Sequence, residues 1–241
     1  MYRRWWSVSL VAAALPLALP APVEAGSALP RSFSGVNTLV AHAAISANLE
    51  ATRGEISAAA LPVASRLPAL VIHDLRVIEP EEFRLYDGSD RLDEGELRRM
   101  RFLLGDGKEA PIRTRTIQLV AKAAYHFNVT KVVVVSSLRK GARHGPHAKG
   151  AAIDFQLVGV PAARLASYLR KEPRVGVGIY TNPNTQFVHV DDREISYHWI
   201  DASPPGAHWR ERMMKDATRD ERDLRYAPEM DLPEALRAPT K

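Results

Sequence analysis

The sequence predicts an α+β fold with a mainly antiparallel sheet and helices packed against it. Short alternating or continuous apolar stretches, typical of strands, recur throughout residues 69–201. Two stretches with helical periodicity follow one another directly, instead of one helix following each strand. The regular strand–helix–strand alternation that indicates a parallel sheet is therefore missing.

The first 25 residues have the pattern of a secretory signal peptide. Arg3 and Arg4 give a positive start, residues 7–21 are apolar, and Val23-Glu-Ala25 resembles a cleavage site. The apolar run is shorter than the ~20 residues that span a bilayer and contains two prolines, which argues against a membrane anchor. We therefore predict a periplasmic or secreted protein without a stable membrane span after signal removal.

Composition narrows the classes of function. The 241 residues contain no cysteine, which excludes disulfides, thiolate metal ligands and a cysteine nucleophile. The formal charge is +5, and removing Arg3, Arg4 and Glu24 with the signal peptide gives 5 − 2 + 1 = +4. This charge favours association with anionic envelope polymers. No Lys/Arg run interleaved with aromatic residues occurs, so no nucleic-acid partner is expected.

The chain divides into a signal peptide (1–25), a linker or N-terminal extension (26–68), a main domain (69–201) and a charged, Pro-containing tail (202–241). In the extension, a loose pattern over 36–49 is compatible with a helix. The main domain is predicted to begin with strands at 70–77 and 82–86 and helices at 93–104 and 115–127, followed by a strand at 131–137 whose β-branched run indicates burial on both faces.

The second half of the main domain carries the candidate chemistry. A strand at 150–157 and a helix at 161–171 are followed by strands at 175–180 and 186–192, which are predicted to form a hairpin around 181–184. Tyr197-His198-Trp199 is expected to form one wall of a cleft. In the tail, residues 207–217 are a candidate for a charged helix.

Two imidazoles and a carboxylate are predicted to converge on a metal site. Residues two apart share a strand face, so Asp154 lies beside Ala152, while Ile153 and Phe155 face a core. His147 immediately precedes this strand and can fold back over Asp154, and His189 lies in the later strand. Two imidazoles and one carboxylate suit catalytic zinc. A hydrogen-bonded core histidine is the competing interpretation of each histidine.

Four motifs in order resemble the zinc D,D-peptidase group that includes the M15 peptidases. The motifs are Ser136-Ser-Leu-Arg139, His147-x-x-Gly150-x-Ala152-x-Asp154, Gly176-Val-Gly178-Ile-Tyr180 and Phe187-Val-His189-Val-Asp191. They are most similar to the periplasmic, YcbK-like branch, over about residues 67–200. The resemblance implies the D,D-peptidase and hedgehog fold and a peptidoglycan stem peptide as substrate. It also implies Zn²⁺ bound by His147, Asp154 and His189, with Arg139 binding substrate.

One departure concerns the catalytic carboxylate. The carboxypeptidases of this group carry it three residues before the last ligand, where this chain has Gln186. Asp191 shares the face of His189 and is the alternative, either as general base or as a group that orients the site. Two functions follow: an exported zinc peptidase acting on peptidoglycan peptides or crosslinks, or a zinc-containing cell-wall binding module with weak or no hydrolysis. No ligand role is assigned to His42, His73, His144 or His198.

Overall fold

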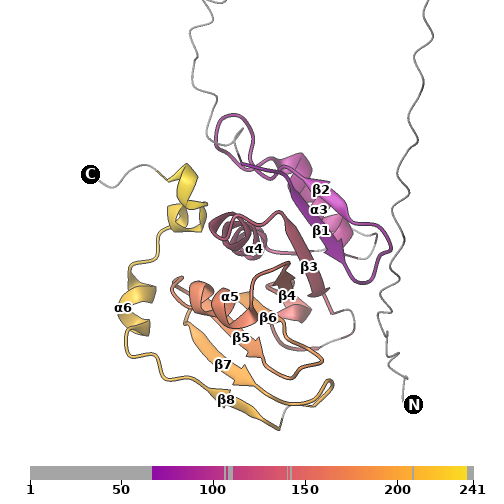
Figure 1. The fold of residues 1–241 in the computed structure, drawn as a ribbon. Coiled ribbons are helices and arrows are strands. Elements are labelled where there is room, and N and C mark those ends of the chain that lie inside the picture. The colour runs from indigo at the N-terminus through magenta and orange to yellow at the C-terminus, as the bar shows by residue number, and fades with distance from the viewer. Residues whose placement is uncertain are drawn as a thin grey trace, which may run out of the picture. The chain divides into compact units, whose positions relative to one another are not determined.

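The computed structural model describes residues 67–105, 107, 111–139, 141, 143–207 and 209–237. The predicted signal peptide and extension, with the helix over 36–49, lie outside these residues apart from Leu67 and Pro68. Within the described ranges, every helix is too short or too polar to cross a membrane. The described residues form an eight-stranded sheet with helices packed against it (Figure 1).

The sheet is mixed in direction. Its strands are β1 (Leu70–Asp74), β2 (Glu81–Phe83), β3 (Lys131–Ser136), β4 (Ala152–Leu157), β5 (Val175–Tyr180), β6 (Val188–Asp192), β7 (Tyr197–Asp201) and β8 (Glu211–Met213). They lie in the order β2-β1-β3-β4-β6-β5-β7-β8. Five neighbouring pairs are antiparallel, but β1 pairs with β3 and β5 pairs with β7 in parallel. The prediction of a mainly antiparallel sheet is therefore confirmed only in part. Strand β3 runs parallel to its neighbour β1, and β7 runs parallel to its neighbour β5.

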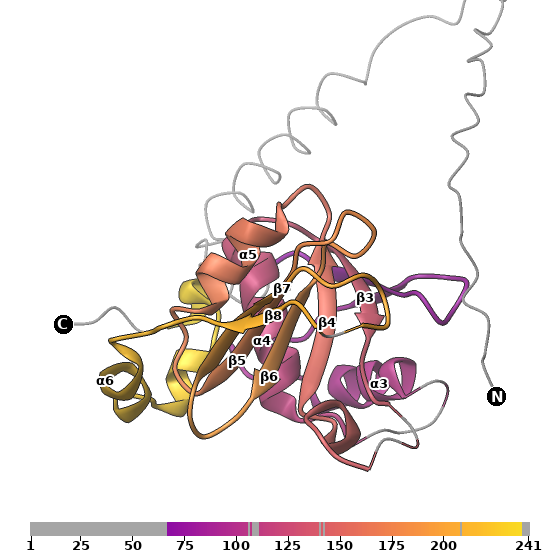
Figure 2. The same cartoon turned by 90° about the horizontal axis from the view of Figure 1, so that it is seen from below.

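Three helices follow the predicted periodicity: α3 (Glu94–Leu104), α4 (Thr114–His126) and α5 (Ala162–Leu169). The Asp93 side chain caps α3 by accepting hydrogen bonds from the Gly95 and Glu96 amides, which satisfies two otherwise unpaired donors. Helices α4 and α5 contact β4 and β6, and α5 also contacts β5 (Figure 2). They cover one face of the central sheet.

The two sides of the central strands differ in chemistry. The apolar face includes Val134, Phe155 and Val177, which belong to the buried core beneath the helices. The opposite face of β4 carries Ala152 and Asp154, as alternation predicts. Strand β3 is fully buried on one face only, with Val132 and Val134 buried and Val133 partly exposed, so the prediction of burial on both faces is wrong. The β-branched run reflects strand propensity without full burial.

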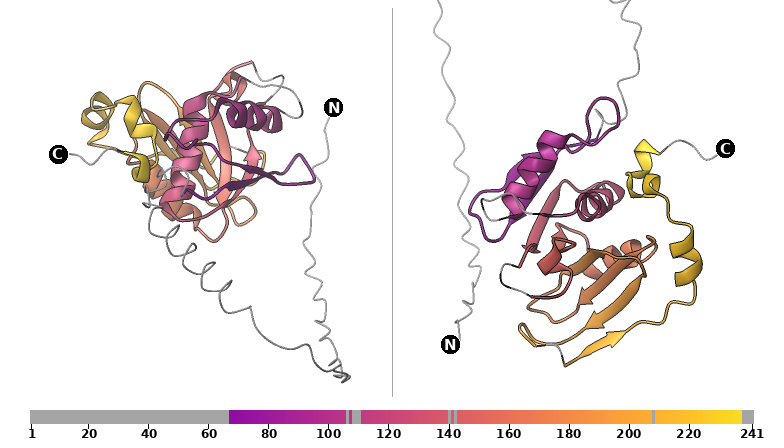
Figure 3. Two further views of the ribbon diagram at one scale, coloured as in Figure 1. Left: turned by 90° about the horizontal axis from the view of Figure 1, so that it is seen from above. Right: turned by 180° about the vertical axis from the view of Figure 1, so that it is seen from behind.

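The C-terminal segment departs from the sequence prediction. The helix predicted over 207–217 is wrong: part of that range forms β8, which pairs with β7, and α6 (Arg219–Leu224) begins later. Two 3₁₀ turns, η2 (Pro228–Asp231) and η3 (Glu234–Leu236), follow α6, and η2 contacts α4 (Figure 3). The charge run has no apolar stripe to hold a helix against the domain, whereas the edge of β7 offers unpaired backbone groups.

Buried charges attach this segment to the domain. Arg115 of α4 donates to the Asp231 carboxylate at 3.0 Å and to the Asp192 carboxylate at 2.8 Å. The buried ammonium of Lys122 pairs with Glu172 and donates to the Met230 carbonyl at 2.6 Å. Residues that the sequence placed in a tail therefore contact the helix that packs on the sheet.

Candidate metal centre

Three separate elements supply the candidate ligands. Asp154 of β4 and His189 of β6 are direct cross-strand partners in the antiparallel register, so both side chains leave the sheet at the same level. His147 lies in the 3₁₀ turn η1 (His147–Lys149), which precedes β4. Gly150 ends this turn with φ +64°, and a Cβ there would lie 2.1 Å from the Pro111 carbonyl oxygen. Glycine is therefore required to return the chain from His147 into β4.

The ligand atoms converge closely. His147 Nε2 lies 3.1 Å from His189 Nδ1 and 3.2 Å from Asp154 Oδ1, and His189 Nδ1 lies 2.7 Å from Asp154 Oδ1. All three residues are buried, with exposed fractions of 7%, 1% and 4% in chain order. Among the described residues, they form a group whose donor atoms could hold one metal ion.

The second nitrogen of each imidazole is already engaged. His147 Nδ1 lies 2.7 Å from the Ser137 carbonyl oxygen, and His189 Nε2 lies 2.9 Å from Asp191 Oδ2. Each of these nitrogens therefore carries its proton and donates, which leaves the lone pairs of His147 Nε2 and His189 Nδ1 for a metal. Ligands at ~2.0–2.1 Å from a tetrahedral zinc ion lie about 3.3 Å apart, which is close to the two spacings of His147 Nε2, 3.1 and 3.2 Å, and longer than the 2.7 Å between His189 Nδ1 and Asp154 Oδ1. The donor set fits zinc.

Asp191 lies on the outer side of His189, away from Asp154. Its side chain is fully buried, Arg193 Nε donates to its Oδ1 at 2.5 Å, and the Arg193 guanidinium also binds its Oδ2. Gly176 is the β5 partner of Asp191, and a Cβ there would lie 2.2 Å from Asp191 Oδ2. Both Asp191 oxygens are engaged by His189 and Arg193, and Asp191 is not one of the three converging candidate ligands, so this position suits an orienting group.

The indole ring of Trp199 packs beside the imidazole ring of His189. Its ring centroid lies 5.0 Å from that of His189, across the position of Gly178. A Cβ at Gly178 would approach the indole to 2.3 Å, so the absence of a side chain lets Trp199 reach His189. Tyr197 and Trp199 both lie beneath the Arg193 guanidinium. Tyr197 and Trp199 lie on the sheet face of the metal centre, whereas His198 points to the opposite face.

Arg139 reaches the centre from the loop after β3. Its guanidinium lies 2.7 Å from Asp154 Oδ2, and 52% of its side chain is exposed. Gln186 is exposed, with φ +42°, and precedes β6, which begins at Val188. His144 is exposed in the loop before η1. The structure thus brings Arg139 to the ligand group but places the Gln186 side chain at the surface.

In the metal-free centre, the charges around His189 determine its protonation state. Burial lowers the pKa of His189, but the hydrogen bonds and charges of Asp154 and Asp191 outweigh it and raise the pKa to about 9. Burial raises the pKa of Asp154 and Asp191, but His147 and His189 at Asp154, and His189 and Arg193 at Asp191, hold both values below the usual range. The metal-free centre therefore carries an imidazolium between two carboxylates at neutral pH.

Sequence reasoning missed the partners of the ligands. Ser137 and Arg193 were given no contact with the histidines, because such contacts depend on loop course and side-chain direction. In the sequence, Arg193 is only a weak indication of a contact with Asp191, because basic residues are common at the solvent-exposed ends of strands. Gly176 and Gly178 of β5 make room for contacts of the site: Gly176 faces the Asp191–Arg193 pair, and Gly178 faces Trp199.

Two comparisons with known proteins agree with this centre. Residues 99–199 match the family model described as peptidoglycan L,D-endopeptidase MepK. A curated relative, the probable peptidoglycan L,D-endopeptidase MepK of Haemophilus influenzae, is 32% identical over 77 residues, which cover 32% of this chain and 40% of the relative. The match therefore spans about two fifths of that relative. No solved structure matches the chain.

The matched region contains all three candidate ligands, Arg139 and Asp191. The resemblance to M15-type peptidases is confirmed, whereas the assignment to the YcbK-like branch remains a prediction. The similarity of residues 99–199 to this family agrees with a buried His-Asp-His group that the sheet register and a glycine-terminated turn bring together. Residues 99–199 are therefore similar to the M15-type peptidases.

Proposed function

We propose that this chain is an exported, zinc-dependent peptidase that acts on peptidoglycan stem peptides or crosslinks. The main observation is that His147 Nε2, Asp154 Oδ1 and His189 Nδ1 converge while the other imidazole nitrogens donate to Ser137 and Asp191. A zinc ion held by these atoms supplies a hydrolytic nucleophile at neutral pH and polarises the scissile carbonyl. Residues 1–25 supply the export signal in this proposal.

Arg139 binds the substrate in this proposal. Its guanidinium is half exposed, with Nη2 donating to Asp154 Oδ2 and Nε to Ser136 Oγ, so Nη1 is the nitrogen left to donate to a peptide carboxylate or carbonyl. The stacked rings of Tyr180 and Phe187, whose centroids are 4.3 Å apart, continue the same sheet face past His189. They give a partly exposed aromatic surface on which the chain of the substrate can lie.

Asp191 and Arg193 position His189 in this proposal. Asp191 accepts from His189 Nε2 and fixes the tautomer that presents Nδ1 to the metal. Arg193 holds the carboxylate by both oxygens, and its own plane is held over Tyr197 and Trp199. Of the two roles considered for Asp191 from sequence, this geometry supports orientation over general-base catalysis.

The second candidate is a zinc-containing wall-binding module with weak or no hydrolysis. The exposed Gln186 in place of the catalytic carboxylate, and the engagement of both Asp191 oxygens, favour it. The two candidates share the metal centre and the cleft-facing arginine, and they differ in whether a peptide bond is broken.

The test combines metal analysis with peptidoglycan digestion. The protein, His147→Ala, His189→Ala and the control His144→Ala are assayed for zinc by elemental analysis, then incubated with purified peptidoglycan. About one zinc per chain in the protein and the control, with new peptide ends only from these two, supports the peptidase. Mass spectrometry of the new ends distinguishes an L,D-endopeptidase from a D,D-endopeptidase or a carboxypeptidase. Zinc without cleavage supports the binding module, and absence of zinc in the protein contradicts both.

A further inference from the structure

A buried polar network lies behind His147, at the ring nitrogen that does not face the other two candidate ligands. Ser137, which follows the end of β3, is 1% exposed, and its carbonyl oxygen lies 2.7 Å from His147 Nδ1. The hydroxyl of the same serine donates to the Leu104 carbonyl at 2.7 Å. Ser137 therefore holds the imidazole with its backbone and is itself held by its side chain.

Arg76 binds the hydroxyl of Ser137. Its Nη2 atom lies 2.6 Å from Ser137 Oγ and 2.7 Å from the carbonyl oxygen of Leu104. Leu104 is the last residue of α3, where the helical carbonyls have no partner within the helix. Strands β1 and β3 pair in parallel, so the residues that follow them lie at the same edge of the sheet (Figure 1). The network therefore joins the ends of β1, α3 and β3.

Asp74 fixes the guanidinium of Arg76. The Asp74 side chain is fully buried, Arg76 Nε donates to its Oδ1 at 2.9 Å, and Arg76 Nη2 binds its Oδ2. This bidentate contact holds the guanidinium in one plane. One Nη2 proton then points to Asp74 and the other to Ser137 Oγ, whose own proton points to Leu104. Every donor of the chain from Asp74 to Ser137 has an acceptor.

An equivalent pair lies behind the other histidine. Asp191 and Arg193 are also two residues apart, and Arg193 also binds one carboxylate oxygen through Nε and the other through Nη2. Asp191 accepts directly from His189, whereas the first pair reaches its histidine through a serine. Both imidazoles are thus supported by an aspartate–arginine pair on the nitrogen that faces away from the candidate ligands.

We infer that Asp74 and Arg76 are positioning residues of the metal centre. By holding the hydroxyl of Ser137, Arg76 fixes the direction of the adjoining carbonyl, which keeps the proton of His147 on Nδ1 and leaves Nε2 for the metal. This inference rests on the proposed zinc peptidase. It extends the centre to two residues outside 99–199, the range that matches the family model.

The first experiment measures zinc affinity by competition with a chelator. We expect Arg76→Gln and Ser137→Ala each to lower the affinity by about tenfold. Both changes remove the same contact, so the double variant should lose less than about twofold beyond either single variant. Unchanged affinity in the single variants, or additive losses in the double variant, would overturn the inference. If Arg76→Gln does not fold, Asp74→Asn, which keeps the shape of the side chain, takes its place in the same cycle.

The second measurement uses the metal-free protein and does not depend on zinc. NMR follows the proton on His147 Nδ1, whose exchange with water should be about tenfold faster in Arg76→Gln and Ser137→Ala than in the parent. If the parent binds no zinc, the proposed function fails and these exchange rates alone decide the inference. If the parent binds zinc while both readouts are unchanged in the variants, the inference fails and the proposed function stands.

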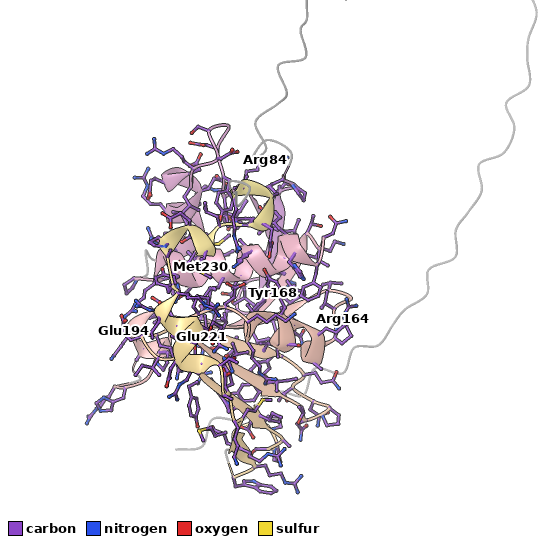
Figure 4. The ribbon with its side chains drawn as sticks, turned by 90° about the vertical axis from the view of Figure 1, so that its left-hand side faces the viewer. Arg84, Arg164, Tyr168, Glu194, Glu221 and Met230 are labelled. Atoms are coloured by element: carbon purple, nitrogen blue, oxygen red, sulfur yellow. The ribbon has the colours of Figure 1, made fainter. Side chains whose placement is uncertain are left out.

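Two control variants separate positioning from stability and charge. Arg222 of α6, the helix on which Figure 4 labels Glu221, is 13% exposed and binds Asp216 at 2.7 Å. Arg222→Gln therefore removes a partly buried, paired arginine from another part of the fold, and Arg212→Gln removes an exposed arginine of β8. We expect both controls to keep zinc affinity within about twofold of the parent. A loss in Arg222→Gln equal to that in Arg76→Gln would overturn the positioning role.

Discussion

The Asp191 carboxylate accepts a hydrogen bond from His189 at Nε2, 2.9 Å away, on the side of the ring turned away from Asp154. This contact assigns the two ring nitrogens different tasks, because the proton on Nε2 leaves Nδ1 free to bind a metal. Substituting Asp191→Asn weakens the acceptor and removes its charge. We expect zinc affinity to fall by about 10–100-fold, as measured by competition with a chelator. Unchanged zinc affinity would exclude the orienting role.

Arg193 is expected to act on the metal through Asp191. Arg193→Lys keeps the charge but loses the bidentate contact and the planar stack over Tyr197 and Trp199. Zinc affinity should therefore decrease in Arg193→Gln and decrease less in Arg193→Lys, while Arg212→Gln leaves it unchanged. An Arg193→Gln protein with normal zinc affinity and only reduced thermal stability would show that Arg193 has a structural role alone.

Asp191 and Arg193 occupy the space that a side chain at Gly176 would need. A methyl group there would lie 2.2 Å from Asp191 Oδ2 and 2.3 Å from the Arg193 guanidinium. We expect Gly176→Ala to lower the free energy of unfolding by about 1–3 kcal/mol in urea denaturation. In an Arg193→Ala background part of the clash is relieved, so the cost of Gly176→Ala should be smaller. Equal costs in the two backgrounds would contradict the contact.

The stability of the metal-free protein should depend on pH through His189. Its pKa is about 9 when folded and 6.5 in the reference state, so its contribution is complete below about pH 6.5 and is lost as pH rises through 9. At 1.36 kcal/mol per pKa unit the contribution is on the order of 3 kcal/mol. Urea unfolding in chelator from pH 6 to 10 measures it. His189→Gln should flatten this part of the profile, and a profile identical to that of the parent would be inconsistent with the pair of carboxylate contacts.

Zinc affinity should show the opposite dependence. The metal competes with a proton on His189, so this competition alone should raise zinc affinity by about tenfold per pH unit from pH 6 to about 9. Isothermal titration in buffers of different ionisation enthalpy should detect the release of about one proton per bound ion near pH 7. Release of no proton would mean that His189 is already neutral in the metal-free centre.

The convergence of the three candidate ligands could be predicted from sequence because it rests on local rules. Strand alternation put Asp154 on the polar face of β4, and proximity along the chain put His147 next to it. The partners of the histidines depend on which strands are neighbours. Gly176 contacts the Asp191–Arg193 pair because β5 pairs with β6 in one particular register, and a single sequence does not show that register.

The sequence alone does not decide between the two roles considered for Asp191, general base and orienting group. Alternation establishes that His189 and Asp191 share a face, but it does not establish which ring nitrogen the carboxylate meets. That choice depends on two side-chain rotamers and on the arginine that binds the other side. The strand directions could not be predicted for a similar reason. Strand β7 is parallel to β5 because it joins the β5 edge of the β5–β6 hairpin, and a single sequence does not show which edge is used.

The turn η1, which contains His147, would affect how the domain responds to the binding and loss of a metal ion. Asp154 and His189 remain paired through the sheet, whereas His147 is joined to them across a loop that begins after β3. An ion bound by all three acts as a removable crosslink between that loop and the sheet. Chelation should therefore open the loop before the sheet unfolds, and limited proteolysis should cut first between Arg139 and His147.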